Sequence, residues 1–209
     1  MALSYNRIAG QGLERLAALS DGIFAVAMTL LILDIKTPDH AEIHSEAGLI
    51  QALRGLFPSF LIFFMSVVTL GIFWVGQQTQ LNHLKRGDRN LSWIHIAFLA
   101  IISILPFSTR LLAEFIEFQT ALVVYWFNIL LLGIILYFSW RYAKRQGLVS
   151  EEMTEELSCA IERRILIAQG LYFAGMLLCF VNVWASIGFI LLVQLNYVVA
   201  PRLGFLNKL

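Results

Sequence analysis

Charged residues are scarce in this 209-residue sequence. Asp, Glu, Lys and Arg together make up 14% of it, whereas hydrophobic residues make up 59%. An average soluble domain carries about 25% charged residues, so the composition predicts an integral membrane protein. The net charge is only +1. Because nucleic-acid-binding proteins concentrate Lys and Arg in exposed basic patches, and no such cluster occurs here, nucleic acid is not expected as a partner.

Catalytic and metal-binding motifs are also missing. The sequence has no nucleophile elbow, phosphate-binding loop or H-E-x-x-H motif. Its two cysteines, Cys159 and Cys179, lack metal-ligand spacing and are interpreted as small buried residues. The four histidines are scattered, and a metal pair made by His40 and His44 in a predicted loop is much less expected than solvated side chains. We therefore predict neither an enzyme nor a bound cofactor.

Long apolar segments, by contrast, occur six times. About 20 helical residues cross a hydrocarbon layer of roughly 30 Å. The segments therefore predict an all-α membrane protein with six transmembrane helices, which form a single domain over residues 1–209. They cover about residues 16–35, 57–76, 91–112, 121–140, 165–181 and 184–200.

Local signals add detail between and within these spans. Pro106 is expected to kink or end the third helix, because proline lacks the backbone N–H that an interior helical position uses. Residues 77–90 are polar and basic and predict a loop. The loop after the first span is expected to include a short surface helix from Glu46 onward. Ser150, followed by two glutamates, indicates a helix N-terminus, where acids face the positive end of the helix dipole.

Six spans place both termini on the same side of the membrane, and the basic residues predict which side. Lys and Arg prefer cytoplasmic segments. With the termini inside, twelve of the 15 Lys and Arg residues are cytoplasmic and three are external. The cytoplasmic set is Arg7, Arg15, Lys85, Arg86, Arg89, Arg141, Lys144, Arg145, Arg163, Arg164, Arg202 and Lys208, and the external set is Lys36, Arg54 and Arg110. We therefore predict cytoplasmic N- and C-termini.

The first span contains a carboxylate, Asp21. An ionised carboxylate at membrane depth costs on the order of 3 kcal/mol, so Asp21 is expected to face protein or water. On a helical wheel with about 100° per residue, one face groups around Ile23 and Asp21 falls on the opposite face. Asp21 is therefore expected to be tucked against its own subunit. The Ile23 face consists of Leu16, Leu19, Ser20, Ile23, Val26, Ala27, Leu30 and Asp34.

The Ile23 face has two interpretations. Most aliphatic stripes belong to a core, so the residues alone favour ordinary helix packing. Alternatively, rings of Ile23 and Leu30, about 10 Å apart along the axis, could gate a pore by dewetting, with Ala27 as a wider gap between them. Asp34 is then either a solvated acid at a helix end or part of a carboxylate ring at the pore mouth that concentrates cations.

Residues of the first span also carry a family resemblance. Arg15, Leu19, Ser20, Asp21 and Ala25 resemble the R-x-x-x-F-S-D-x-x-x-A signature that opens the first helix of the TMEM175 family of potassium channels. Leu19 stands where the family usually has Phe. The T-V-G-Y-G filter of ordinary potassium channels is absent from the sequence, so any ion selectivity must come from a constriction of another kind.

A second motif extends the resemblance over essentially the whole chain. The stretch LPFSTRL, residues 105–111, resembles the L-P-F-x-T segment of the family's third helix. The resemblance implies a homotetramer whose first helix lines the pore, with its constriction just after the S-D pair. It also implies a prokaryotic member, because animal members carry two six-span units in each chain.

The resemblance further implies a polar hub around the S-D pair. In the family this pair is tied to polar and aromatic residues of neighbouring helices, and a histidine often follows the second-helix tryptophan by three residues. Gln77 stands at that place here, so the network is expected to be only partly present. A hub that holds the fold is favoured over direct ion contact. Its expected members are Arg15, Ser20, Asp21, Trp74, Gln77, Trp93 and His95.

The preferred function is a potassium-conducting, hydrophobically constricted channel in the plasma membrane of a prokaryote. Potassium is the expected permeant ion, and the expected partners are further copies of the chain and the lipid bilayer. One rival is a secondary transporter or proton-coupled carrier with Asp21 and His95 as a titrating pair, although carriers commonly show repeats and broken helices. Another is a membrane scaffold without transport.

Overall fold

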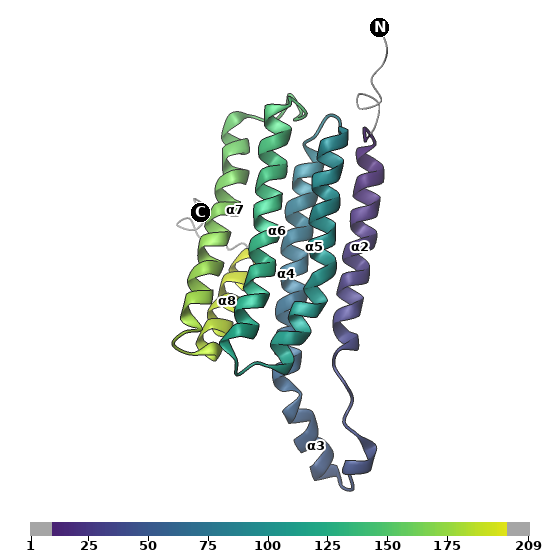
Figure 1. Cartoon of the computed structure of the whole chain (residues 1–209), viewed down its shortest axis with the longest axis vertical. Helices are drawn as coiled ribbons and strands as arrows, with labels where there is room; N and C mark the ends of the chain where they lie inside the picture. The colour runs from purple at the N-terminus through teal and green to yellow at the C-terminus, as the bar shows by residue number, and fades with distance from the viewer. Residues whose placement is uncertain (1–9, 200–209) are drawn as a thin grey trace.

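The computed structural model describes residues 10–199, and this part of the chain is built from helices (Figure 1). The predicted all-α architecture is therefore confirmed. Within the described residues the elements are α2 (Leu13–Leu33), the short 3₁₀ helix η1 (His40–Glu42), α3 (Glu46–Gly55), α4 (Phe57–Asn82), α5 (Arg89–Glu114), α6 (Gln119–Arg145), α7 (Glu155–Leu178) and α8 (Val183–Val199).

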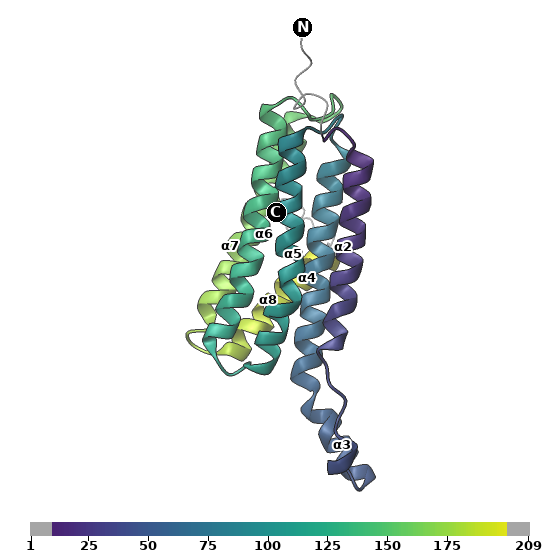
Figure 2. The same ribbon diagram turned by 45° about the vertical axis from the view of Figure 1, so that its right-hand side comes forward.

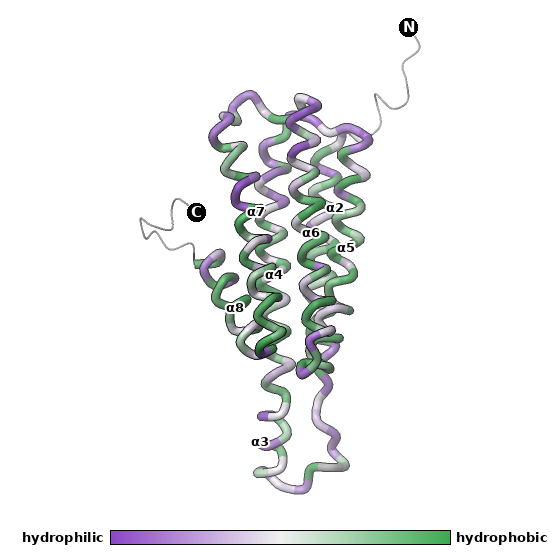
Figure 3. Tube along the Cα trace, turned by 60° about the vertical axis from the view of Figure 1, so that its left-hand side comes forward, coloured by the Kyte–Doolittle hydropathy of each residue, from purple (hydrophilic) through white to green (hydrophobic). Residues whose placement is uncertain are grey.

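The long helices α2, α4, α5, α6 and α7 run side by side, as Figures 1 and 2 show. Helix α5 packs against α2, α4 and α6, and the shorter α8 packs between α4 and α7. Helix α3 projects beyond the bundle (Figure 2). Apolar residues dominate the middle of the bundle, and polar residues gather toward its ends (Figure 3).

The two ends of the bundle differ in their connections. At one end, here called the α3 end, lie α3 and the turns from α5 to α6 and from α7 to α8. At the other, the loop end, the α4–α5 and α6–α7 connections pair with each other: the Lys85 amide donates to the Leu148 carbonyl at 2.9 Å, and the Ser150 amide to the His83 carbonyl at 2.8 Å. The two predicted sets of basic residues thus lie toward opposite ends, as far as they are described.

Four helices are long and apolar enough to cross a membrane: α2, α4, α5 and α6. The chain is therefore a multi-pass membrane protein by length and composition. Helix α8 is apolar but has only 17 residues, and α7 begins with a charged turn that contains Glu155 and Glu156. The crossing of the membrane by α7 and α8, and with it the count of six spans, stays a prediction.

Several helix ends differ from the prediction because polar residues continue a helix past its apolar stretch. Helix α4 runs to Asn82, so the predicted loop over residues 77–90 was wrong for its first six residues. Helix α5 continues through Pro106 to Glu114, so the proline does not end it. The short surface helix expected from Glu46 is confirmed as α3, whose cap Ser45 accepts a hydrogen bond from the Gly48 amide.

Two predictions on the charged segment around the start of α7 were wrong. Ser150 does not begin the helix; the cap is Thr154, whose hydroxyl accepts a hydrogen bond from the Leu157 amide at 3.3 Å. The Ser150 amide is instead used in the pairing of the two loops. Cys159 was expected to be buried but is exposed, because it lies on a solvent-facing turn of α7, whereas Cys179 is buried as expected.

A buried polar network joins four helices in the half of the bundle toward the α3 end. The hydroxyl of Tyr125 on α6 lies 2.9 Å from Thr69 Oγ1 and accepts from Ser66 at 3.3 Å. Thr109 on α5 donates to Ser66 at 2.8 Å, and Gln194 on α8 donates to Thr69 at 2.7 Å. Because such groups find no water in hydrocarbon, their mutual bonds hold α8 against α4, α5 and α6.

Gly133 of α6 makes a close contact with α7. A Cβ at this position would collide with the Gln169 side chain. Gly133→Ala should lower the unfolding temperature of the detergent-purified protein by about 3–8 °C, because overpacking costs about 1–3 kcal/mol. Gly170→Ala is the matched control, since a Cβ there meets no heavy atom within 4 Å and should leave stability unchanged or higher. Equal unfolding temperatures for Gly133→Ala and the unmodified protein would contradict the contact.

Candidate functional site

Helix α2 has one buried face and one face that its own subunit leaves uncovered. Its buried residues are Leu16, Ser20, Phe24, Ala27 and Leu31, which follow one another at spacings of three and four. On the uncovered face lie Leu19, Val26, Leu30 and Leu33, with exposed fractions of 48%, 55%, 44% and 73%. Together with the half-buried Ile23 they form a continuous apolar stripe, which we call the α2 stripe.

The predicted Ile23 face includes residues of both the buried face and the α2 stripe. Ile23 and Leu30 lie on the α2 stripe, but Ala27 is only 2% exposed and packs inside the subunit. The placement of Ala27 between Ile23 and Leu30 on an open face was therefore wrong. The error arises because Ile23 sits at the edge of the contact with the core, so a wheel centred on Ile23 is rotated toward the buried side.

Ser20 begins a chain of buried hydrogen bonds that crosses four helices. The Gln77 side chain on α4 donates from Nε2 to Ser20 Oγ at 2.9 Å and to His95 Nδ1 at 3.1 Å. On the other side of the ring, His95 Nε2 lies 3.2 Å from Ser139 Oγ on α6. Since Nδ1 accepts from an amide, the ring proton of a neutral His95 resides on Nε2 and is donated to Ser139. Gln77 thus joins the first helix to the rest of the bundle.

Asp21 belongs to a second, separate group. Its Oδ1 accepts hydrogen bonds from Trp74 Nε1 and Gln78 Nε2, both at 2.8 Å and both from α4. Asp21 is exposed at the bundle surface, and both of its donors belong to α4 of the same chain, so it lies against its own subunit as expected. The α4 contact arises because a residue next to buried Ser20 on α2 is turned by about 100° and reaches the flank of α4.

Five of the seven predicted hub residues are thus brought together, in two groups. The remaining two, Arg15 and Trp93, are exposed, and no hydrogen bond to the hub is found for either among the described residues. The sequence analysis missed Gln78 and Ser139. Gln78 could have been found as the neighbour of Gln77 at the polar end of α4, whereas nothing in the sequence pairs Ser139 with His95 across 44 positions.

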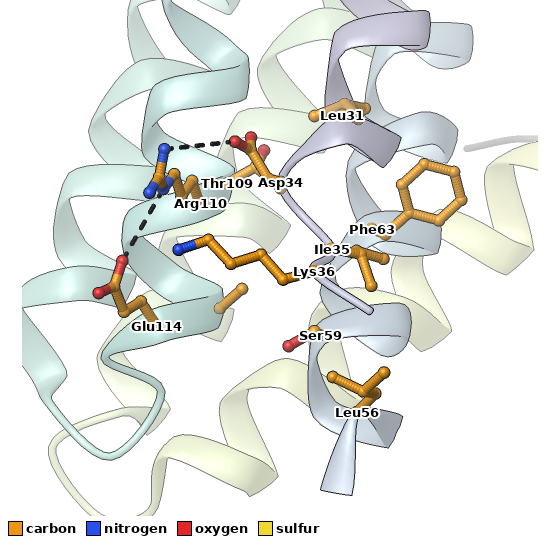
Figure 4. Close-up of a pocket in the computed structure, with 11 residues that line it drawn as sticks. Leu31, Asp34, Ile35, Lys36, Leu56, Ser59, Phe63, Thr109, Arg110 and Glu114 are labelled. Carbon is orange, nitrogen blue, oxygen red and sulfur yellow. Dashed lines mark ion pairs between the residues drawn. The ribbon is translucent and has the colours of Figure 1, made fainter. Parts of the chain in front are cut away.

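At the α3 end, Asp34 lies beside a small charged pocket (Figure 4). The pocket has a volume of about 280 Å³. Arg110 of α5 lies between two acids: its Nη1 is 3.6 Å from Asp34 Oδ1, and its Nε is 3.8 Å from Glu114 Oε2. The Lys36 side chain reaches across the pocket toward α5 (Figure 4). Asp34 therefore forms an ion pair with Arg110, which the sequence analysis did not predict.

Comparison with known proteins identifies relatives of nearly the whole chain. A family model described as the endosomal/lysosomal potassium channel TMEM175 matches residues 15–106. A potassium channel of Chamaesiphon minutus is 32% identical over 178 residues, which are 83% of this chain and 87% of that protein. A potassium channel of Streptomyces collinus is 37% identical over 103 residues, which are 49% of this chain and 48% of that protein.

A solved structure and an animal protein are also similar to this chain. The crystal structure of a lysosomal potassium-selective channel TMEM175 homolog from Chamaesiphon minutus superimposes with a TM-score of 0.77 at 28% identity, covering 91% of this chain and 98% of that one. The human endosomal/lysosomal proton channel TMEM175 is 32% identical over 107 residues, which are 49% of this chain but 21% of that protein. The chain belongs to the TMEM175 family of channels and is not an enzyme.

Proposed function

We propose that this chain is the subunit of a homotetrameric potassium-conducting channel in a prokaryotic plasma membrane, with α2 lining the pore. The observation that carries the proposal is the α2 stripe, an apolar surface left uncovered by its own subunit. One helix per subunit cannot enclose a pore, so a lining role for α2 requires a closed symmetric ring of copies. The names of the two bacterial relatives support potassium as the permeant ion.

The constriction is assigned to Ile23 and Leu30. Both belong to the α2 stripe, and seven residues place their rings about 10 Å apart along the pore axis. Ala27 is left out because it packs into the core of the subunit. In the absence of a T-V-G-Y-G segment, an aliphatic constriction opposes ion passage by dewetting.

The remaining part of the proposal concerns topology. Helices α7 and α8 complete a single six-span domain, and both termini lie in the cytoplasm. The support is the distribution of Lys and Arg, since the set at the loop end is much larger than the set at the α3 end. The loop end is then cytoplasmic, and the pocket around Arg110 faces the outside.

A carrier built on Asp21 and His95 is not favoured. The two side chains belong to separate hydrogen-bonded groups, Asp21 with Trp74 and Gln78 and His95 with Gln77 and Ser139. A proton shared between the two would need a bond that joins the groups, and the relatives are named as channels.

Electrical recording from purified protein in a planar bilayer tests the proposed function. With potassium on one side and sodium on the other, a potassium channel gives single-channel steps and a reversal potential displaced toward the potassium equilibrium potential. Flux without steps would indicate a carrier, and no flux would indicate a scaffold. Because the animal relatives are named proton channels, a proton gradient at equal potassium concentrations should be recorded as well.

Ile23→Asn should raise the single-channel current and weaken the preference for potassium over sodium. A polar side chain lowers the barrier that a partly hydrated ion meets at a dewetted ring. Ile32→Asn is the matched control, because Ile32 is an exposed isoleucine of the same helix on the opposite side of the wheel. Unchanged current and selectivity in Ile23→Asn, or equal effects of both variants, would argue against the constriction.

Asp21→Ala should reduce the tetramer fraction on size-exclusion chromatography. The change leaves the Trp74 and Gln78 donors without their acceptor, at a cost of about 1–3 kcal/mol. Asp21→Asn retains an oxygen in the same place and should preserve the tetramer. A stable Asp21→Ala tetramer with altered ion selectivity would instead place Asp21 in the ion path.

The charges at the α3 end should change inward current in opposite directions. Asp34→Asn removes a negative charge and should lower inward current at low external salt, whereas Arg110→Gln leaves Asp34 and Glu114 unopposed and should raise it, each by about twofold. Both effects should shrink at 0.1 M salt and above, where charges are screened over about 10 Å. Arg54→Gln on α3 is the control. Effects of the same sign would show that the pocket acts on structure rather than on the ion path.

A further inference from the structure

A groove opens between α4 and α7. Helix α8 packs between α4 and α7 toward the α3 end (Figure 1). Toward the loop end, α4 and α7 face each other across a groove of about 720 Å³, with Leu136 of α6 and Tyr197 of α8 among its lining residues. A volume of this size lies in the range of small-molecule sites, roughly 300–1,000 Å³.

The mouth of the groove carries a positive charge without an opposing acid. Among the described residues that line the groove, Arg164 of α7 is charged, His83 lies on α4, and no Asp or Glu occurs. The Arg164 guanidinium lies 5.3 Å from the centre of the Tyr197 ring, which holds it at the groove by a cation–π contact. No ion pair of Arg164 is found within residues 10–199. The mouth is therefore complementary to an anion.

The walls of the groove are apolar, but its floor contains unpaired polar atoms. Gln80 and Gln169 donate from Nε2 to the α6 carbonyls of Leu136 and Ile129, at 3.0 and 3.4 Å. These bonds fix the orientation of both amides, so that each Oε1 is left as an acceptor. Neither Oε1, nor the hydroxyl of Tyr172, has a hydrogen-bond partner within the described part of the chain. Gln80 and Tyr172 are each only 1% exposed.

An occupant must therefore combine three chemical features. It needs an anionic group for Arg164, hydrocarbon for walls such as Val68, Ile72 and Ile161, and polar atoms between the two. Buried polar groups without partners are costly, so pure hydrocarbon fits the floor poorly. A glycerophospholipid supplies a phosphate, ester carbonyls that accept from Tyr172, and, when its headgroup is glycerol, hydroxyls that donate to the amide oxygens.

We propose that the groove between α4 and α7 is a binding site for an anionic glycerophospholipid of the phosphatidylglycerol type, with its phosphate on Arg164 and an acyl chain between the two helices. The lipid comes from the leaflet at the loop end. Its glycerol region lies near Gln80, one helical turn from His83. The site depends on neither the ion that the chain conducts nor the constriction on α2.

Native mass spectrometry of the full chain in mild detergent tests this site. After exchange into mixed micelles, phosphatidylglycerol should be retained in preference to phosphatidylcholine. Arg164→Gln should weaken that retention about five- to tenfold, in line with the loss of one cation near a phosphate. Arg163→Gln is the matched control, because it removes the neighbouring exposed arginine, which does not line the groove. Ala160→Trp fills the groove and should abolish retention while leaving the oligomer intact.

Four outcomes would overturn the proposal. Equal retention of both lipids, or equal effects of Arg164→Gln and Arg163→Gln, would leave the groove without headgroup recognition. Loss of the oligomer in Ala160→Trp would assign the groove to a neighbouring copy. Retention of phosphatidylglycerol only after removal of residues 200–209 would assign it to the chain's own end. Lipid retention is measured without ion flow, so each of these outcomes refutes the site and leaves the proposed function untouched.

Discussion

The bond system from Ser20 through Gln77 and His95 to Ser139 is the constraint on which the arrangement of the bundle depends. These side chains are buried where hydrocarbon supplies no water, so their hydrogen-bond donors are stabilised by acceptors on neighbouring helices. Because Gln77 donates to both Ser20 and His95, α2 has one rotation about its axis in which the bonds form. That rotation buries Phe24, Ala27 and Leu31 and leaves the α2 stripe uncovered.

Two further sets of hydrogen bonds fix the bundle elsewhere. The network around Tyr125 holds α8 against α4, α5 and α6 toward the α3 end, and the paired loops hold the connections at the loop end. Between these levels α4 and α7 are not in close contact, and the groove results from this geometry. Hydrogen bonds thus hold the helices together at these two levels, whereas α4 and α7 stay apart between them.

Much of the architecture could be predicted from the sequence. The apolar segments gave the helices, and Ser20, Asp21 and Gln77 were identified as interacting residues, because motif and composition are local properties. The exact ends of α4 and α6 could not be predicted, since hydropathy does not mark where a helix continues into polar residues. The Asp34–Arg110 pair was also missed. It joins residues that are far apart in the chain and adjacent only once α2 and α5 have packed.

The sequence by itself determined that the chain is an α-helical membrane protein, how its basic residues divide between the two ends, and to which family it belongs. Each of these follows from composition or from residues within one helix. Only the tertiary structure decided which face of α2 is uncovered, that Ala27 is buried whereas Ile23 and Leu30 border the open surface, and that a groove opens beside Arg164. A helical wheel fixes the angles between residues but not the rotation of the helix, which depends on its contacts with α4 and α5.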